Sequence, residues 1–229
     1  MNSALAYVNS IVAALSPLRD GERATAMAAY MKNHFAFLGV ASPMRRAVSK
    51  LIPKPALVEA HAVARALWKQ NEREYQYVAV DLLAALANKL DASSTLDLIE
   101  ELALEKSWWD GVDGLAGVAS TILQHNIDTR GIVWTWSSHD SFWVNRLAIL
   151  HQNGWGNATD KQVLFKLCST HAHSDEFFVR KAIGWALREY AWADPKAVQT
   201  FVATHRDRLS TLSVREALKN VGNQHVKPL

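Results

Sequence analysis

The segment Lys106-Ser-Trp-Trp-Asp-Gly-Val-Asp113 places two indoles and two carboxylates within about two turns of a helix. Trp109 and Asp113 are four residues apart, so on a helix their side chains would share one face. A carboxylate can stabilise a developing positive charge and orient a water molecule, and the face of an indole attracts cations. We therefore predict a functional site here. One of the two neighbouring tryptophans is expected to pack in the interior instead, and Asp110 could cap the helix or pair with Lys106.

Two further segments each place an aromatic residue three positions before an arginine. They are Phe142-Trp143-Val-Asn-Arg146 and Ile183-Gly-Trp185-Ala-Leu-Arg188-Glu-Tyr190. The arginine guanidinium binds phosphate through two parallel hydrogen bonds and also stacks on aromatic planes. Aromatic residues and arginines that alternate along a groove are therefore typical of nucleic-acid binding more than of protein partners.

The N-terminal part of the chain carries an excess of positive charge. The segments Tyr30-Met-Lys32-Asn-His-Phe35 and Pro43-Met-Arg45-Arg46 add an aromatic residue and three cations to it. Seven basic residues lie between Arg19 and Lys54 against two acids, whereas acids gather between Asp97 and Glu105. This distribution favours a basic face. The net charge is only +3, so an ordinary solvated surface would explain these charges equally well.

The elements that must position these residues are predicted to be helices. Turn and cap signals such as Asp20-Gly21 and Asp194-Pro195 separate the apolar runs, and no Asn-Gly or Asp-Gly hairpin lies between alternating apolar runs. Within the runs, apolar residues recur at helical spacing, as in Val78, Leu82 and Leu86 and again in Ile183, Leu187 and Tyr190. The chain is therefore predicted to be all-α, with short helices joined by short loops.

A motif of the form Arg-x-Ala recurs at a nearly constant interval in the second half of the chain. It is found in Val144-Asn-Arg146-Leu-Ala148, Val179-Arg180-Lys-Ala182 and Val214-Arg215-Glu-Ala217, with the arginines 34 and 35 residues apart. This period is typical of two-helix units stacked into a right-handed α-solenoid, in which each unit packs only against its neighbours.

Equivalent positions of such repeats would line the concave face of the array. Arg146, Arg180 and Arg215 are therefore predicted to form a ladder of guanidinium groups, which suits a polyanion. The alternative is that these arginines pair with acids of the same helices, such as Glu176 and Glu216.

Length, composition and cysteine content bound the class of protein. The 229 residues, of which 49% are hydrophobic, suit a single globular domain over residues 1–229. Cys168 is the only cysteine, so no intramolecular disulfide can form, which fits a reducing cytoplasm. The apolar stretch from Ala4 to Leu15 is interrupted by polar residues and predicts an amphipathic helix instead of a signal peptide. No apolar run is long enough to span a bilayer.

A resemblance to a known family is carried by four strings of sequence. They are Tyr30-Met-Lys-Asn-His-Phe-Ala-Phe-Leu-Gly39, Lys106-Ser-Trp-Trp-Asp-Gly-Val-Asp113, Trp143-Val-Asn-Arg146-Leu-Ala-Ile-Leu150 and Phe177-Phe-Val-Arg-Lys-Ala-Ile-Gly-Trp185-Ala-Leu-Arg-Glu-Tyr190. With these strings the chain resembles, nearly from end to end, the bacterial AlkD family of DNA alkylation repair glycosylases, which are built of HEAT-like helical repeats.

The resemblance implies roles for individual residues. Trp109, Asp113, Arg146 and Trp185 fall on the family's catalytic positions, and Tyr30 falls on the third aromatic position around the lesion. Arg146 is expected to hold the phosphate next to the lesion. Further cations are expected to contact the DNA without reading its sequence: Lys32, Arg45, Arg46, Arg180, Arg188 and Arg215.

The activity implied by the resemblance is hydrolysis of the N-glycosidic bond of cationic alkylated purines, 7-methylguanine and 3-methyladenine, which leaves an abasic site. A positively charged base departs as a neutral molecule, so no general acid has to protonate it. Asp113 is expected to stabilise the oxocarbenium-like sugar and to position the attacking water. Tyr30, Trp109 and Trp185 would attract the cation. Lys106 is not placed for Schiff-base attack, so we expect a monofunctional glycosylase.

Further expectations concern cofactors, partners and location. We expect neither a cofactor nor a metal, since the nearest histidine pair, His171-Ala-His173, has no carboxylate at zinc-like spacing. The expected partner is double-stranded DNA containing alkylated bases, bound by a monomer in the cytoplasm near the nucleoid, with no membrane involved. Whether the damaged base is flipped out of the stack stays open.

Two alternative interpretations differ in the chemistry that they require. A HEAT-type scaffold would bind DNA or protein without catalysis, as repeat arrays commonly do. Such a scaffold tolerates scattered acids, whereas an enzyme acting on damaged DNA needs the arginines and the indoles to converge on Asp113. A helix-hairpin-helix glycosylase is disfavoured, because the sequence has no glycine-rich hairpin followed by a catalytic aspartate.

Overall fold

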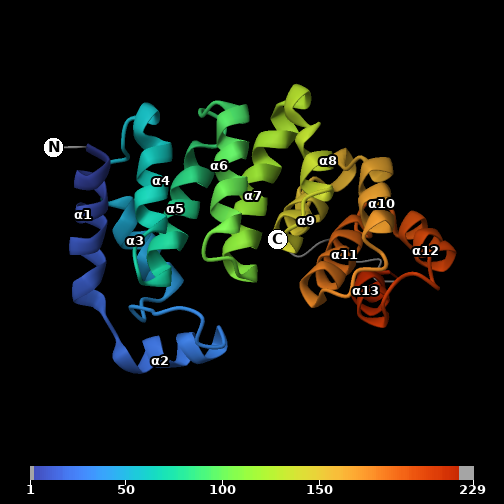
Figure 1. Cartoon of the computed structure of the whole chain (residues 1–229), viewed down its shortest axis with the longest axis horizontal. Coiled ribbons are helices and arrows are strands. Elements are labelled where there is room, and N and C mark those ends of the chain that lie inside the picture. Colours follow the sequence, from blue (N-terminus) through green and yellow to red (C-terminus); the bar gives the residue numbers. More distant parts are fainter. Residues whose placement is uncertain (1–2, 222–229) are drawn as a thin grey trace. The chain divides into compact units, whose positions relative to one another are not determined.

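The computed structural model describes residues 3–221, and the structural statements below concern this part of the chain. Within it the chain is all-α, as predicted, and no strand forms apart from a single bridge between Ala36 and Glu72. The helices (Figure 1) are α1 (Ser3–Leu15), α2 (Gly21–Tyr30), α3 (Ser42–Lys50), α4 (Ala60–Trp68), α5 (Arg73–Leu86), α6 (Ala92–Leu104), α7 (Trp109–His125), α8 (Ile132–Ser137), α9 (Phe142–Leu150), α10 (Lys161–Thr170), α11 (Phe177–Tyr190), α12 (Pro195–Thr204) and α13 (Thr211–Ala217).

Helix starts coincide with the cap residues that the sequence contains. The Asp20 side chain accepts a hydrogen bond from the Arg23 backbone N–H at 2.9 Å and caps α2. Asp194 accepts one from the Ala197 N–H at 2.9 Å and caps α12, whose first residue is a proline. A short polar side chain that satisfies an N–H of the first turn stabilises a helix by about 1 kcal/mol. The predicted turn positions at both sites are confirmed.

The helices group into two compact units. One contains the residues up to Leu98 and the other those from Ile99 onward, so the division falls inside α6. The single domain over residues 1–229 stays a prediction.

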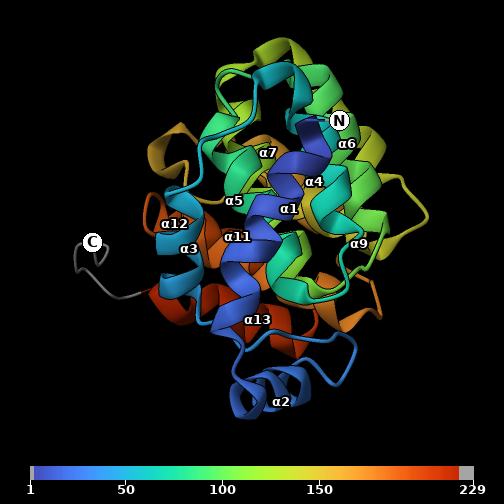
Figure 2. The ribbon, with the colours of Figure 1, turned by 90° about the vertical axis from the view of Figure 1, so that its left-hand side faces the viewer.

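The first unit is built on α4, which packs against α1 on one side and α5 on the other (Figures 1 and 2). α3 contacts both α1 and α5, and α2 lies beyond the end of α1 and across its axis. The apolar stripe predicted for α5 is buried in this packing at Val78, Leu82 and Leu86. Burial of each such side chain stabilises the fold by about 1.5–3 kcal/mol.

A buried carboxylate ties the segment after α2 to α5. Glu74 accepts hydrogen bonds from the backbone N–H groups of Leu38, Gly39 and Val40 at 2.9, 2.8 and 3.1 Å. Gly39 has a φ of +85°, and a Cβ atom there would lie 2.1 Å from the Asp20 carbonyl oxygen. Glycine is therefore required at this position, both for its conformation and for the close approach of the backbone.

The second unit is a row of packed helices from α7 to α13. α9 contacts α7, α8 and α11, and α11 in turn contacts α13; these helices are labelled in Figure 1. Ile183, Leu187 and Tyr190 of α11 are buried, as the helical spacing predicts. This packing brings helices that are one predicted repeat apart into direct contact.

The repeat period is visible in the side-chain hydrogen bonds of both units. In the first unit His61 bonds Thr95 at 2.9 Å across a separation of 34 residues. In the second, Ser137 bonds His171 at 2.9 Å across 34 residues, and the Trp155 indole donates to Ser120 Oγ at 2.8 Å across 35. Since equivalent helices are stacked at this period, the predicted α-helical repeat is confirmed within each unit. The concave face of the whole array stays a prediction.

Candidate functional site

A bidentate ion pair joins Asp113 of α7 to Arg146 of α9. Arg146 Nε donates to Asp113 Oδ1 at 2.7 Å, and Nη2 donates to Oδ2 at 2.8 Å. The two residues are 33 positions apart in the chain, so each comes from one of two successive repeats. Two parallel N–H···O bonds are the strongest arrangement of an arginine and a carboxylate, and they fix the plane of the carboxyl group.

The guanidinium of Arg146 is fully buried, and a third partner holds it in place. Its Nη1 donates to the Phe178 carbonyl oxygen of α11, and the residue has no exposed surface. A group with this burial and these three bonds cannot reach a DNA phosphate without moving. The expected phosphate contact is therefore not supported, and the geometry of Arg146 is that of a residue positioning Asp113.

Asp113 lies one turn into α7 and keeps a quarter of its side chain exposed. Burial raises the pKa of the carboxyl group above its ordinary value, the Arg146 guanidinium opposes that rise, and nearby Asp110 adds to it. The result is a carboxylate with both oxygens bonded to one cation and an edge still open to solvent. Such a group can accept a hydrogen bond from water or stabilise a positive charge in front of it.

The indole of Trp185 lies beside this pair and is surrounded by cations. The Arg146 guanidinium carbon is 5.2 Å from the ring centroid, Lys181 Nζ is 5.4 Å away and the Arg188 guanidinium carbon 5.9 Å away. Lys181, Trp185 and Arg188 follow one another at spacings of four and three on α11, so they share one face. Trp185 is thus brought together with Asp113 through Arg146, and its half-buried ring has the orientation needed for cation–π contact.

Glu216 of α13 holds the cations beside Trp185. This buried carboxylate is 3.0 Å from Arg188 Nη1, 3.3 Å from Lys181 Nζ and 2.8 Å from Lys219 Nζ. The hydrogen bond from Lys219, followed by that from Lys181, holds the pKa of Glu216 below its ordinary value against the opposing effect of burial. Three cations meet one anion, so the cluster keeps a local excess of positive charge that could attract a phosphate.

The close approach of α11 and α13 depends on Gly184. A Cβ atom at this position would lie 2.5 Å from the Glu216 Cβ and 3.0 Å from the Ser213 carbonyl oxygen. Gly184 precedes Trp185, so the glycine that brings Glu216 close to α11 lies next to the indole of the site.

The two neighbouring tryptophans Trp108 and Trp109 are both half-buried. Trp108 packs against other rings, with centroid distances of 5.2 Å to Phe178 and 5.9 Å to Trp143. Trp143 and Phe178 in turn lie 4.9 Å apart. Trp108 is therefore the packing member of the pair, while Trp109 begins α7 one turn before Asp113.

Tyr30 and the N-terminal cations all belong to the first unit. Tyr30 ends α2 with 71% of its surface exposed and lines a small apolar hollow with Met27 and Phe37. Lys32 is exposed and has a left-handed backbone with a φ of 57°. The structure describes each unit separately, so the convergence of Tyr30 with Trp109 and Trp185 stays a prediction.

Arg45 and Arg46 are adjacent in sequence but have opposite environments. Arg45 is buried, pairs with Asp81 at 3.0 Å and lies 4.9 Å from the centroid of the Tyr77 ring. The guanidinium of Arg45 is therefore used inside the first unit, and its expected contact with DNA stays a prediction that this burial disfavours. Arg46 is exposed, and its Nε lies 3.4 Å from Asp81. It is available to an external anion.

The predicted ladder of repeat arginines is not a set of equivalent side chains. Arg146 is buried, Arg180 is half-exposed and pairs with Asp175 at 2.6 Å, and Arg215 is exposed. Arg188 pairs with Glu216. The alternative in which the repeat arginines pair with acids thus describes Arg146 and Arg180, although their partners are Asp113 and Asp175 and not Glu176 or Glu216.

Three features of the site were not predicted from the sequence. Lys181 stands next to Arg180 in the repeated motif, so its proximity to Trp185 could have been found from the helical spacing of four residues. Glu216 also stands within the repeated motif and was considered only as a partner of the repeat arginines. The Phe178 carbonyl oxygen carried no signal, because backbone acceptors have no sequence signature.

Residues 3–221 contain neither a metal-binding cluster of side chains nor a membrane-spanning helix. No group of three or more histidine, cysteine, aspartate or glutamate side chains in this range could hold a metal ion. No helix in the same range combines the length and the apolar character needed to cross a bilayer.

Comparisons with known proteins agree on one family. The family model of DNA alkylation repair enzymes matches residues 11–221. Among solved structures, the chain is similar to a predicted DNA alkylation repair enzyme from Enterococcus faecalis, with a TM-score of 0.80 and 29% sequence identity. That likeness covers 89% of this chain and 97% of the other. A search of curated proteins found no match.

Proposed function

The chain belongs to the family of DNA alkylation repair enzymes, and from this premise we propose that it is a monofunctional DNA glycosylase. Its substrate would be a positively charged alkylated purine in double-stranded DNA, of the type of 7-methylguanine or 3-methyladenine. Hydrolysis of the N-glycosidic bond would release the free base and leave an abasic site. The observation that carries the proposal is the partly exposed carboxylate of Asp113, fixed by Arg146 beside the indole of Trp185.

The chemistry of the substrate explains why so few groups are needed. An alkylated purine already carries the positive charge that a general acid would otherwise have to supply, so it leaves as a neutral base. The remaining demands are stabilisation of the oxocarbenium-like sugar and delivery of a water molecule.

Asp113 can meet both demands. Its negative charge would stabilise the sugar cation, and its exposed edge can accept a hydrogen bond from the attacking water. The two bonds from Arg146 favour the ionised carboxylate and hold it in one orientation. In this proposal Arg146 acts through Asp113 and does not touch the DNA.

The aromatic groups would bind the cationic base or sugar. The quadrupole of the Trp185 indole attracts positive charge, and three protein cations already lie within cation–π distance of this ring. Trp109 shares a helix face with Asp113, and Tyr30 would be the third aromatic group if the two units bring it close. Each such contact would contribute roughly 0.5–2 kcal/mol.

The duplex would be held by cations at the surface. Those with exposed or half-exposed side chains are Lys32, Arg46, Arg180, Arg188 and Arg215. Contacts of this kind release counterions from the DNA, so affinity should fall steeply as salt is added and should depend little on sequence.

The proposal is tested by incubating the protein with methylated duplex DNA and identifying the released bases by chromatography. Asp113→Asn should reduce the release of 7-methylguanine and 3-methyladenine by more than about 100-fold, while the affinity for the duplex stays nearly unchanged. Asp110→Asn is the matched control, since Asp110 is half-buried in the first turn of the same helix. Its turnover should stay close to that of the wild type.

Two results would contradict the proposal. Unaltered turnover by Asp113→Asn would reject the catalytic assignment. Tight binding of methylated DNA by the wild type without any released base would favour the non-catalytic scaffold.

A further inference from the structure

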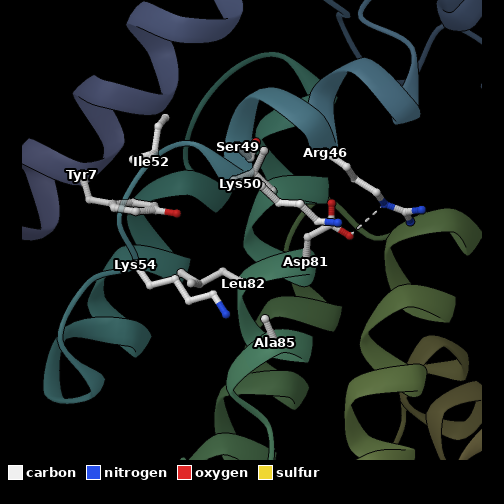
Figure 3. Close-up of a pocket in the computed structure, with 10 residues that line it drawn as sticks. Tyr7, Arg46, Ser49, Lys50, Ile52, Lys54, Asp81, Leu82 and Ala85 are labelled. Atoms are coloured by element: carbon white, nitrogen blue, oxygen red, sulfur yellow. Dashed lines mark ion pairs between the residues drawn. The ribbon is translucent and has the colours of Figure 1, made fainter.

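A cavity of about 270 Å³ opens on the first unit, between α1, α3 and α5 (Figure 3). Its apolar lining comes from Ile52, Val78 and Leu82. The ring of Tyr7 points into it from α1. None of these residues belongs to the site around Asp113, so the proposed glycosylase reaction leaves the cavity unexplained.

The cavity has the size of a pocket for one side chain or one small ring system. Pockets that enclose drug-sized ligands measure roughly 300–1,000 Å³, and an apolar cavity of about 150 Å³ accommodates benzene. A volume of 270 Å³ therefore fits a single large apolar side chain, such as a leucine or an aromatic residue.

Three cations stand around this apolar lining. Arg46, Lys50 and Lys54 all line the cavity, and the Lys54 amine points into it (Figure 3). The acid among the lining residues is Asp81, and its oxygens are already bound by Arg45 at 3.0 Å and Arg46 at 3.4 Å. The rim thus keeps a positive charge that an acidic ligand would complement.

A buried hydroxyl and an exposed apolar residue add to this picture. Ser49 lines the cavity, and its Oγ is buried without a hydrogen-bond partner in the described part of the chain, so it could bond a polar group of a ligand. Leu51, the residue that follows α3, has 83% of its surface exposed and stands in the chain between the lining residues Lys50 and Ile52.

These features discriminate between classes of ligand. A DNA phosphate is bound by cations alone and gains nothing from an aliphatic cavity or from an exposed Leu51. A neutral nucleobase would leave the three cations of the lining without a partner. A released alkylated purine is neutral, so it too would leave the three cations without a partner. A peptide with acidic residues around one large apolar side chain satisfies the lining, the rim and the Ser49 hydroxyl together.

We propose that this cavity is a docking site for an acidic segment of a partner protein that inserts one large apolar side chain between α3 and α5. The apolar side chain would supply the anchor, and the acidic residues would meet Lys50 and Lys54. None of the residues that line the cavity belongs to the site around Asp113, although Arg46 is also one of the cations proposed to hold the duplex.

The experiment selects random peptides from a display library on the intact protein, with counter-selection on the Lys50→Glu/Lys54→Glu variant. Enriched peptides should contain acidic residues on either side of one leucine, phenylalanine or tryptophan.

Their affinity should fall about tenfold or more for Ala85→Trp, since Ala85 is an exposed lining residue of α5 and a larger side chain there would occupy the cavity. Ala84→Trp is the matched control, because Ala84 is exposed on the same helix and does not line the cavity. Thermal unfolding of each variant verifies that it is folded.

Several results would overturn the proposal. Peptides enriched without acidic residues, no enrichment over the counter-selection variant, or equal losses for Ala85→Trp and Ala84→Trp would each contradict it. The Lys50→Glu/Lys54→Glu variant should bind undamaged duplex DNA as the wild type does. A salt-sensitive loss of duplex affinity would assign these lysines to the DNA interface instead, and a loss of binding to anionic lipid vesicles would assign them to a membrane surface.

Discussion

The guanidinium of Arg146 binds both carboxylate oxygens of Asp113 from the preceding repeat, at 2.7 and 2.8 Å. Its remaining terminal nitrogen is bonded to the Phe178 carbonyl oxygen of α11. One buried side chain thereby joins α7, α9 and α11, and the packing of three helices fixes the orientation of the carboxylate proposed to act on DNA.

Arg146→Lys should lower base release and leave DNA affinity nearly intact. Lysine keeps the charge but cannot form two parallel bonds to the carboxylate, so Asp113 loses its fixed orientation. The loss of one charged hydrogen bond of about 1.5–3 kcal/mol corresponds to roughly a 10- to 100-fold decrease in rate. Single-turnover release and duplex affinity would be measured together. If duplex affinity fell more than the release rate, Arg146 would contact a DNA phosphate after all, in spite of its burial.

The pH dependence of base release should report the ionisation of Asp113. Burial raises the pKa of this carboxyl group, and the ionised form is the one that can stabilise a cation, so activity is present above the pKa and lost as pH falls through it. The decline should begin at a higher pH than for an ordinary aspartate, whose pKa is about 3.9. In Arg146→Lys the decline should move to still higher pH. Rates of base release would be measured at acidic pH for the wild type and for Arg146→Lys, and corrected for spontaneous depurination. If the release rate instead declined at the pKa of an ordinary aspartate, the catalytic role of Asp113 would be contradicted.

Gly184→Ala should destabilise the second unit and weaken DNA binding. A methyl group there would lie 2.5 Å from the Glu216 Cβ, so α11 and α13 would have to separate, at a cost of about 1–3 kcal/mol. The shift would also displace Arg188 and Lys181 from Trp185. Gly117→Ala is the control: Gly117 lies inside α7 with nothing within 4 Å of the added atom, and alanine there should stabilise by about 0.5–1 kcal/mol. Chemical denaturation compares the two, and equal effects would contradict the packing argument.

Glu216→Gln should lower stability at neutral pH and flatten its dependence on acid. The pKa of Glu216 is lowered in the folded state, first by Lys219 and then by Lys181, so its contribution is present above the unfolded pKa and lost as pH falls through the folded one. Removing the charge leaves three cations without their shared anion, at a cost of roughly 3 kcal/mol. The free energy of unfolding would be measured for both proteins from neutral to acidic pH. If the free energy of unfolding depended on pH in the same way for both proteins, the Glu216 carboxylate would not stabilise the fold through its charge.

Much of the fold followed from local sequence. Apolar residues such as Val78 and Leu82 recur at helical spacing, and this spacing depends only on the geometry of the helix. The interval between Arg146, Arg180 and Arg215 predicted stacked repeats, because each repeat buries its apolar face against the next. Asp20 and Asp194 marked helix starts, since a cap bonds N–H groups of its own first turn.

The roles of individual charges could not be predicted in this way. Arg146 and Arg180 occupy the same motif, yet one is buried on Asp113 and the other pairs with Asp175 at the surface. Arg45 and Arg46 are neighbours, yet only Arg45 is enclosed by α5. Helical periodicity assigns a direction to each side chain, but the carboxylates that meet Arg45 and Arg146 come from helices one repeat away. The sequence by itself thus determined the helices, the period and the residue types of the site. Only the tertiary structure decided which cations are buried against carboxylates and which face the solvent, because desolvation and pairing depend on the packing of neighbouring helices.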